Sequence, residues 1–144
     1  MSNNQSKIYF VRPDKNLPAP KRIHSSDAGS DLVCLMTSVI KPFETKIIGT
    51  NMRIAIPHGF FGRVCGRSGL SSQGLLVHPG TIDSGYTGIV GVIATNLTDK
   101  DMTLESSSRI AQIIILPILE FDLEEVDELP ERARGDKGFG HSGM

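Results

Sequence analysis

The stretch GTIDSGYTG at residues 80–88 places a carboxylate close to an aromatic ring. The apolar residue before Asp83 would hold its backbone in a strand while the carboxylate faces a cleft. Tyr86, three residues on, can present a flat ring beside that carboxylate. Together they would provide a carboxylate next to a ring on which a ligand can stack. The alternative interpretation is a plain hairpin turn that binds no ligand.

The stretch GRSGLSSQG at residues 66–74 could bind an anion. Arg67 offers a charged fork, while Ser68 and Gly69 offer a hydroxyl and backbone N–H groups. The alternative interpretation is a strand end followed by a turn.

The last fifteen residues, PERARGDKGFGHSGM at 130–144, differ in composition from the rest of the chain. They contain four glycines, a cluster of charges and one aromatic residue, Phe139, and cannot bury themselves. A frayed tail is the common fate of such a terminus. The alternative is a mobile arm whose backbone N–H groups and arginine bind phosphate while the ring covers a base.

The elements that must position these residues are short strands. The 15 glycines and 8 prolines interrupt runs rich in Val, Ile, Phe and Thr. This rhythm predicts an all-β protein, a jelly-roll-like barrel or sandwich of short strands, with at most one short helix near residues 68–72. The expected strands span residues 8–11, 31–35, 45–48, 52–56, 60–65, 75–77, 89–94, 102–104, 110–116 and 121–126.

Two of these strands differ in the spacing of their apolar residues. Residues 52–56 alternate strictly, with Met, Ile and Ile at every second position, which is typical of a half-buried strand. Residues 110–116 alternate poorly. Poor alternation predicts a strand covered on both faces, which in a small protein suggests burial in a subunit interface.

Length and charge limit the classes of protein to consider. The chain has 144 residues and a formal net charge of −1. The length predicts one domain, at residues 1–129, followed by the arm at 130–144. The near-neutral charge argues against stable nucleic-acid binding. The longest apolar run, residues 113–119, is broken by Pro117 and is too short to span a membrane.

The cysteines and the first residues bear on the compartment. Cys34 and Cys65 have no CxxC spacing, so we expect two buried thiols rather than a disulfide or a zinc site. The chain begins MSNNQSKIYF, without the apolar segment of a secretion signal. An intracellular location, in the cytoplasm or nucleus, is therefore expected.

Five stretches, taken in order and spacing, closely resemble the motifs of the homotrimeric dUTPase family. They are AGSDL at 28–32, GRSGL at 66–70, GTIDSGYTG at 80–88, SSRIAQ at 107–112 and RGDKGFGHSG at 134–143. Each motif alone is weak, but five in register are a strong signal. Three places depart from the family's forms: Gly66 stands for a common Pro, Ser107 and Ser108 for Gly-Asp, and His141 for a Ser or small residue.

The resemblance implies hydrolysis of dUTP to dUMP and pyrophosphate, which keeps uracil out of DNA and supplies dUMP for thymidylate synthesis. Asp83 would be the general base that deprotonates the attacking water. Tyr86 would stack under the deoxyribose and leave no room for a 2′-OH. Backbone groups of a tight hairpin would read the uracil edge; the residues are Gly80, Thr81, Ile82 and Gly91.

The resemblance also implies a set of groups for the triphosphate and its Mg²⁺. The phosphate ligands would be Arg67, Ser68, Gly69 and Gln112. Asp31 would lie near the metal and hold it through water, although a structural salt bridge to an arginine is an equal alternative. The arm would close the site and exclude water, using Arg134, Phe139, Gly140, His141 and Ser142. In this family three chains build each site, so a homotrimer is expected.

Two other functions are consistent with this fold. A dCTP deaminase would need a glutamate as proton shuttle, and the RIAQ segment offers no carboxylate. A binding or regulatory relative would have lost motif residues, and here they are present. An assay of pyrophosphate release from dUTP with Mg²⁺ separates an enzyme from a regulatory protein.

Overall fold

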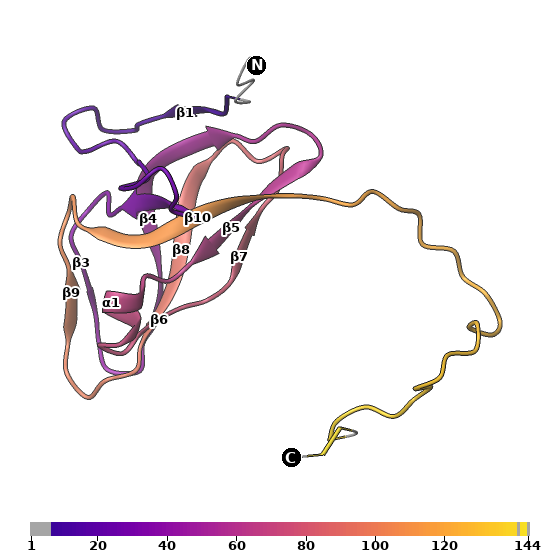
Figure 1. Cartoon of the computed structure of the whole chain (residues 1–144). Coiled ribbons are helices and arrows are strands. Elements are labelled where there is room, and N and C mark those ends of the chain that lie inside the picture. The colour runs from indigo at the N-terminus through magenta and orange to yellow at the C-terminus, as the bar shows by residue number, and fades with distance from the viewer. Residues whose placement is uncertain (1–6, 141, 144) are drawn as a thin grey trace.

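The structure, a computed structural model, describes residues 7–140 and 142–143 of the chain. This part of the chain is all-β with one short helix, as the sequence predicts (Figure 1). The elements are β1 (Tyr9–Val11), β2 (Ser30–Val33), β3 (Ser38–Ile40), β4 (Thr45–Ala55), β5 (Phe60–Cys65), α1 (Ser68–Ser71), β6 (Leu75–Val77), β7 (Gly80–Ile82), β8 (Ile89–Asn96), β9 (Met102–Leu104) and β10 (Arg109–Pro117).

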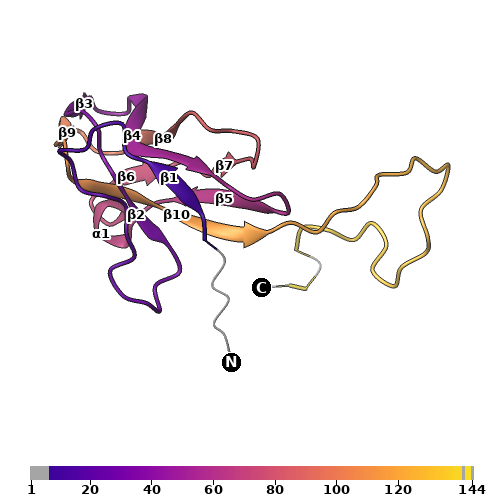
Figure 2. The same ribbon diagram turned by 90° about the horizontal axis from the view of Figure 1, so that it is seen from above.

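The strands form a sandwich of two four-stranded antiparallel sheets, seen from above in Figure 2. One sheet has the order β1-β4-β8-β6 and the other β2-β10-β5-β7, while β3 and β9 pair at one end. The core between them is apolar and includes Leu32, Val64, Val90, Val92 and Ile110, each at most 1% exposed. Burying branched side chains from both sheets is what holds the two layers together.

The strict alternation in residues 52–56 is confirmed. Met52, Ile54 and Ile56 are buried, while Arg53 and Ala55 point to solvent. The segments predicted at 45–48 and 52–56 are, however, one strand, β4. Its pairing with β8 shifts register between residues 49 and 53. This irregularity interrupts the alternation of apolar residues, so the sequence alone suggests two strands where there is one.

The poor alternation of β10 has a local cause. The register between β10 and β2 shifts between Arg109 and Ala111, so that Ile110 and Ala111 are both buried although they are neighbours. Ile114 and the next two residues are only half-buried in the single chain. The bulge therefore explains the neighbouring buried residues at 110 and 111, whereas the apolar residues from Ile114 on are not covered by the single chain, and their burial in a subunit interface stays a prediction.

The strand predicted at residues 121–126 is wrong. Of the described residues after Pro117, none lies in a strand or helix, and the segment runs away from the sheets in Figures 1 and 2. Phe121 and Leu123 are 71% and 92% exposed. Their alternation with acidic residues is typical of a strand, but a strand also needs a partner for its backbone, and the chain itself offers none there.

The two thiols are free, as predicted. Cys34 is buried, and burial raises the pKa of its thiol above the ordinary value. Cys65 is half-exposed, so the prediction of two buried thiols is wrong for this residue. Within the described part of the chain, no helix is long and apolar enough to cross a membrane.

Candidate active site

An ion-pair cluster joins three of the sequence motifs. Asp31, on β2, forms an ion pair through Oδ1 with Arg67 Nε at 3.2 Å and accepts a hydrogen bond through Oδ2 from Arg109 Nη1 at 3.3 Å. Arg67 Nη1 also donates to the Arg109 carbonyl at 3.1 Å. The side chain of Asp31 is only 14% exposed, whereas the two arginines are 32% and 48% exposed. One carboxylate thus aligns two guanidinium groups that still face solvent, which suits the binding of a second, larger anion.

Gln112 and α1 complete this cluster. Gln112 Nε2 donates to the Gly66 carbonyl at 3.0 Å, which holds the amide beside the segment that carries Arg67. A Cβ on Gly29 would lie 2.6 Å from Gln112 Oε1, so only glycine allows this side chain its place. Ser68 and Gly69 open α1, where the first N–H groups have no earlier carbonyl of the helix to bond.

The second group of predicted residues lies in the loop 83–88 between β7 and β8. Asp83 and Tyr86 are both exposed here, and the Tyr86 N–H donates to the Asp83 carbonyl at 3.0 Å. The Tyr86 hydroxyl donates to the Ile89 carbonyl at 2.8 Å, so the ring lies back over its own loop. A Cβ on Gly88 would come within 2.6 Å of that hydroxyl oxygen, so a glycine is required beneath the ring.

Packing within the chain also favours glycine at two positions of the hairpin, Gly80 and Gly91. A Cβ on Gly80 would lie 3.3 Å from Val64 Cβ, and one on Gly91 would lie 3.1 Å from Ile47 Cγ2. Gly91 is paired with Gly49 on β4, which leaves a strip of bare backbone on the outer face of the sheet. A planar ligand could approach that backbone closely.

The sheet topology keeps the two groups apart within one chain. Strand β7 pairs with β5 so that Ile82 is opposite Gly62, while Arg67 follows the other end of β5. Asp83 and Arg67 therefore leave the sheet at opposite ends. Asp31 lies on β2, and the strands β10 and β5 separate β2 from β7 in the sheet. Three interstrand spacings put β2 about 14 Å from β7. The single chain therefore forms the ion-pair cluster and the Asp83 loop but does not bring the two together.

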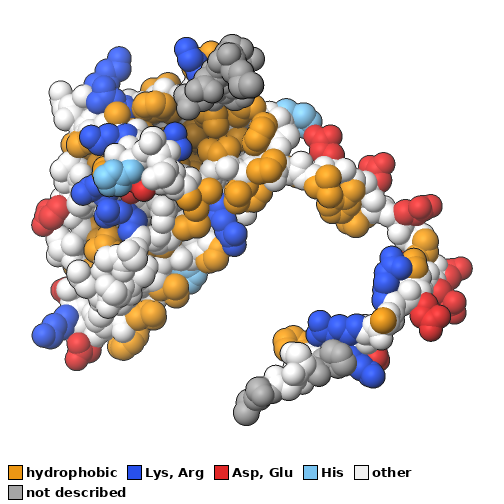
Figure 3. All heavy atoms as spheres, viewed as in Figure 1, with side chains coloured by type: hydrophobic (Ala, Val, Ile, Leu, Met, Phe, Trp, Pro, Cys, Tyr) orange, Lys and Arg blue, Asp and Glu red, His pale blue; other side chains and the backbone are white. Residues whose placement is uncertain are grey.

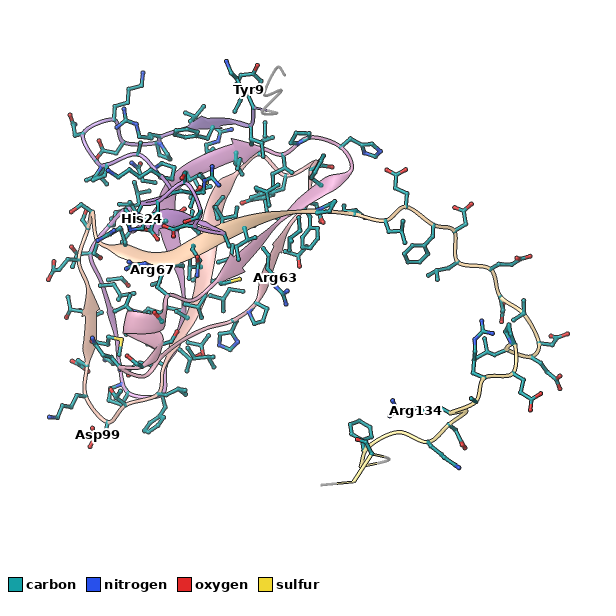
Figure 4. All side chains as sticks on the ribbon, in the orientation of Figure 1. Tyr9, His24, Arg63, Arg67, Asp99 and Arg134 are labelled. Atoms are coloured by element: carbon teal, nitrogen blue, oxygen red, sulfur yellow. The ribbon has the colours of Figure 1, made fainter. Side chains whose placement is uncertain are left out.

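The arm does not reach either group in this chain. Phe139 is fully exposed, and the Arg134 side chain donates from Nε to the Lys137 carbonyl. Figure 4 shows Arg134 far out on the arm, on the opposite side of the view from Arg67. Gly140 and Ser142 are exposed like the rest of the arm, and His141 lies outside the described residues. The arm is therefore available to a neighbouring molecule.

The charges are distributed unevenly. Figure 3 shows Lys and Arg side chains gathered on the side of the body where Figure 4 labels His24 and Arg67, and acidic side chains along the extended segment that follows β10. Although the net charge is only −1, the ion-pair cluster lies in a basic region. A polyanion would be attracted to this side of the molecule.

The carboxylate in the ion-pair cluster would suit a metal ion that is already bound to the phosphates of a substrate. Among the described residues, no three His, Cys, Asp or Glu side chains come together as a metal site. Both carboxylate oxygens of Asp31 are ion-paired with arginines, which is the salt bridge expected from the sequence as the alternative, and contact of Asp31 with a hydrated cation through water stays a prediction. A Mg²⁺ bound to phosphate oxygens would need no more from the protein.

Three contributing residues were not singled out from the sequence. Arg109 lies within the RIAQ motif, but its partner Asp31 is 78 residues away and could not be paired with it by spacing. Gly29 supports Gln112, and Arg53 donates from Nε to the Thr87 carbonyl at 2.9 Å. Arg109 and Gly29 lie within the sequence motifs, which could have indicated a role for them, whereas no motif includes Arg53.

The departures from the motif forms are accommodated. Ser107 has a φ of 71°, a left-handed conformation that a glycine adopts more easily than a serine. Its N–H donates to the Cys34 carbonyl at 2.9 Å, which holds the turn before β10 in place. Gly66 is close to Ser71, since a Cβ there would lie 2.8 Å from Ser71 Oγ. With both departures present, Arg67 is ion-paired with Asp31 and Gln112 is bonded to the Gly66 carbonyl, while the third departure, His141, lies outside the described residues.

Comparison with known proteins agrees along nearly the whole chain. The model of the dUTPase family matches residues 15–143. A deoxyuridine 5′-triphosphate nucleotidohydrolase of Corynebacterium glutamicum is 44% identical over 140 residues, which is 94% of this chain and 94% of that protein. Its counterpart in Clostridium novyi is 38% identical over 141 residues, or 96% of this chain and 99% of that protein.

Solved structures agree with the sequence matches. The dUTPase of Staphylococcus bacteriophage 80alpha, solved with dUPNHPP, has a TM-score of 0.90 and 32% identity over 96% of this chain and 99% of that one. A mutant dUTPase from phage phi11 of S. aureus, whose structure describes the coordination of a structural Mg(II) ion, has a TM-score of 0.81. It is 26% identical and covers 87% of this chain and 99% of its own.

Proposed function

Because the chain belongs to the dUTPase family and is a dUTP diphosphatase, we propose that its two separate groups of residues meet across subunits to hydrolyse dUTP. The family identity rests on the match over residues 15–143 and on relatives of full length. The product dUMP supplies thymidylate synthesis, and removal of dUTP keeps uracil out of DNA. The roles proposed for individual residues rest on their places in the family's motifs and are consistent with their places in the fold.

Asp83 is the general base. Its exposed carboxylate, at the end of β7, takes a proton from a water molecule as that water's oxygen bonds to the α-phosphorus. The bond from the α-phosphorus to the bridging oxygen breaks, and pyrophosphate leaves. Tyr86, bound to the Asp83 carbonyl through its own N–H, lies under the deoxyribose of the same nucleotide.

The triphosphate lies on the cluster around Asp31. Arg67, Ser68, Gly69 and Gln112 bind its oxygens, and Arg109 keeps Asp31 and Arg67 aligned. Asp31 would help to hold Mg²⁺, through water, on a bound triphosphate. When bound, the metal offsets the negative charge of the phosphates and fixes their conformation.

The observation that carries the shared site is the placement of Asp83 and Arg67 at opposite ends of β5 and β7. A nucleoside triphosphate must contact both groups at once, so the second group comes from another copy. A homotrimer with closed symmetry gives every copy the same two neighbours and completes three equal sites. The arm of a third copy then supplies Arg134 and Phe139, together with Gly140, His141 and Ser142.

The hairpin predicts a strict order of substrates. Efficiency is expected to be highest for dUTP and far lower for UTP, dTTP and dCTP, because each mismatch brings a clash or an unpaired polar group into a closed pocket. Pyrophosphate release is measured for the four nucleotides with Mg²⁺ under matched conditions. Comparable hydrolysis of dCTP and dUTP would contradict the pocket, and no release from any nucleotide would favour a regulatory protein.

The ring of Tyr86 provides a more local test of this selectivity. Gly88→Ala is expected to push the ring away, since the new Cβ would fall 2.6 Å from its hydroxyl oxygen. The preference for dUTP over UTP should then fall by about tenfold, because the ring no longer fills the space of the 2′-OH. The ratio of kcat/KM for the two nucleotides measures this change. Gly85→Ala is the matched control, since a Cβ there meets nothing within 4 Å.

A further inference from the structure

The loop 83–88 has few contacts to hold it. It contains no strand or helix, and its side chains are exposed apart from the half-buried Ser84. The two hydrogen bonds of Tyr86, to the carbonyls of Asp83 and Ile89, stay within the loop and the first residue of β8. These bonds shape the loop but do not fix it relative to the rest of the sandwich.

Arg53 makes the link to the sandwich. Its Nε donates to the Thr87 carbonyl at 2.9 Å, across 34 residues of sequence. Among the side-chain hydrogen bonds in the described part of the chain, this one joins residues 83–88 to another element of the fold. The donor is charged, which makes the bond stronger than one between neutral groups.

The Arg53 side chain and Thr87 line the same groove on the surface. Near the C-terminal end of β4, Arg53 is paired with Val11 on β1 and with Ile89 on β8. It lines a groove of about 190 Å³ together with Tyr9, Phe10, Val11 and Thr87. Figure 4 shows Tyr9 at this end of the molecule, on β1. The groove is lined mainly by apolar residues, and the aliphatic stem of Arg53 can pack along them while its guanidinium reaches the carbonyl.

We propose that Arg53 is a positioning residue that holds the Asp83 and Tyr86 loop in its productive place. This proposal rests on the proposed function, since it acts through the base and the stacking ring. Arg53 acts on the reaction only through this loop, because its Nε is bonded to the Thr87 carbonyl. Without its bond the loop keeps its internal shape but shifts relative to β4, and small misplacements of a base are costly to the rate.

The test uses two substitutions that differ in one hydrogen-bond donor. In Arg53→Gln the amide Nε2 takes the position of the guanidinium Nε, so the donor is kept and the charge is lost. In Arg53→Met a methyl group takes that position and the donor is lost as well. Lys41→Met, at an exposed position in the turn between β3 and β4, is the control for loss of one positive charge. All variants are tested as full-length protein.

We expect Arg53→Met to lower kcat by about tenfold with a smaller change in KM, because the base is misplaced while the phosphate cluster is intact. Arg53→Gln should stay within about twofold of the wild type. In the free proteins, amide hydrogen exchange at residues 83–88 should accelerate in Arg53→Met alone. Equal loss in the Gln and Met variants, or no loss in either, would overturn the proposal.

The two readouts separate this proposal from the function on which it rests. If the wild type releases no pyrophosphate from dUTP, the proposed function fails. The exchange rates would still report on the link between Arg53 and the loop. If the wild type is active and exchange at 83–88 is the same in all four proteins, the positioning role fails and the function stands.

Discussion

Asp83→Asn is expected to lower kcat by about 10²- to 10⁴-fold, because the amide keeps the shape of the side chain and loses its basicity. Without a proton acceptor at this position, the water would have to attack the α-phosphorus unaided. Binding should be nearly unchanged, since the phosphate cluster and the hairpin are intact. The measurements are single-turnover hydrolysis of dUTP and equilibrium binding of the analogue dUPNHPP.

Asp99→Asn provides the control for this substitution. Asp99 is exposed in the turn between β8 and β9, and Figure 4 shows it at the far end of the molecule. The same change of charge there should leave turnover as it is. Turnover near the wild-type level in Asp83→Asn would refute the assignment of the base.

Mixing two inactive variants is expected to restore activity. A chain that ends at Pro130 keeps Asp83 but lacks Arg134 and Phe139, and the Asp83→Asn chain keeps its arm but has no base. Each variant alone should be nearly inactive, because every site of the proposed trimer would then lack one component. Unfolding the two together and refolding them gives mixed trimers in which some sites combine an intact base with a neighbour's intact arm.

The expected size of the recovery follows from random assembly. In an equal mixture about one site in four receives both components, because two independent choices must be right in a closed ring. The control mixes Asp83→Asn with a chain that carries both defects, which should recover nothing. Size-exclusion chromatography verifies the mixed trimers. If they form and activity stays at background, the arm does not act across subunits.

Much of the fold could be predicted because it depends on short-range patterns. The alternation in residues 52–56 places one face of β4 in the core, and Ser68 to Ser72 was expected as the single helical turn. Each of these features depends on residues within a window of about one strand. The predicted strand at 121–126 had a similar pattern and failed, because a strand also requires a neighbour.

The identities of the candidate site residues, from Asp31 to Phe139, could be proposed from types and order alone. Their grouping could not. Asp31 and Arg109 are 78 residues apart, and they meet because β2 pairs with β10 in a particular register. The separation of Asp83 from Arg67 likewise depends on the antiparallel pairing of β5 with β7.

The sequence by itself determined the family, the all-β class, the chemical groups and the order of the motifs. The tertiary structure decided which of those groups one chain brings together, that Asp31 lies between two arginines, and that Arg53 reaches the Thr87 carbonyl. The physical reason is the range of the interactions. Side-chain chemistry and periodicity are local, whereas strand register is set by burial of the whole core, so a contact across 34 or 78 residues exists only once that core has formed.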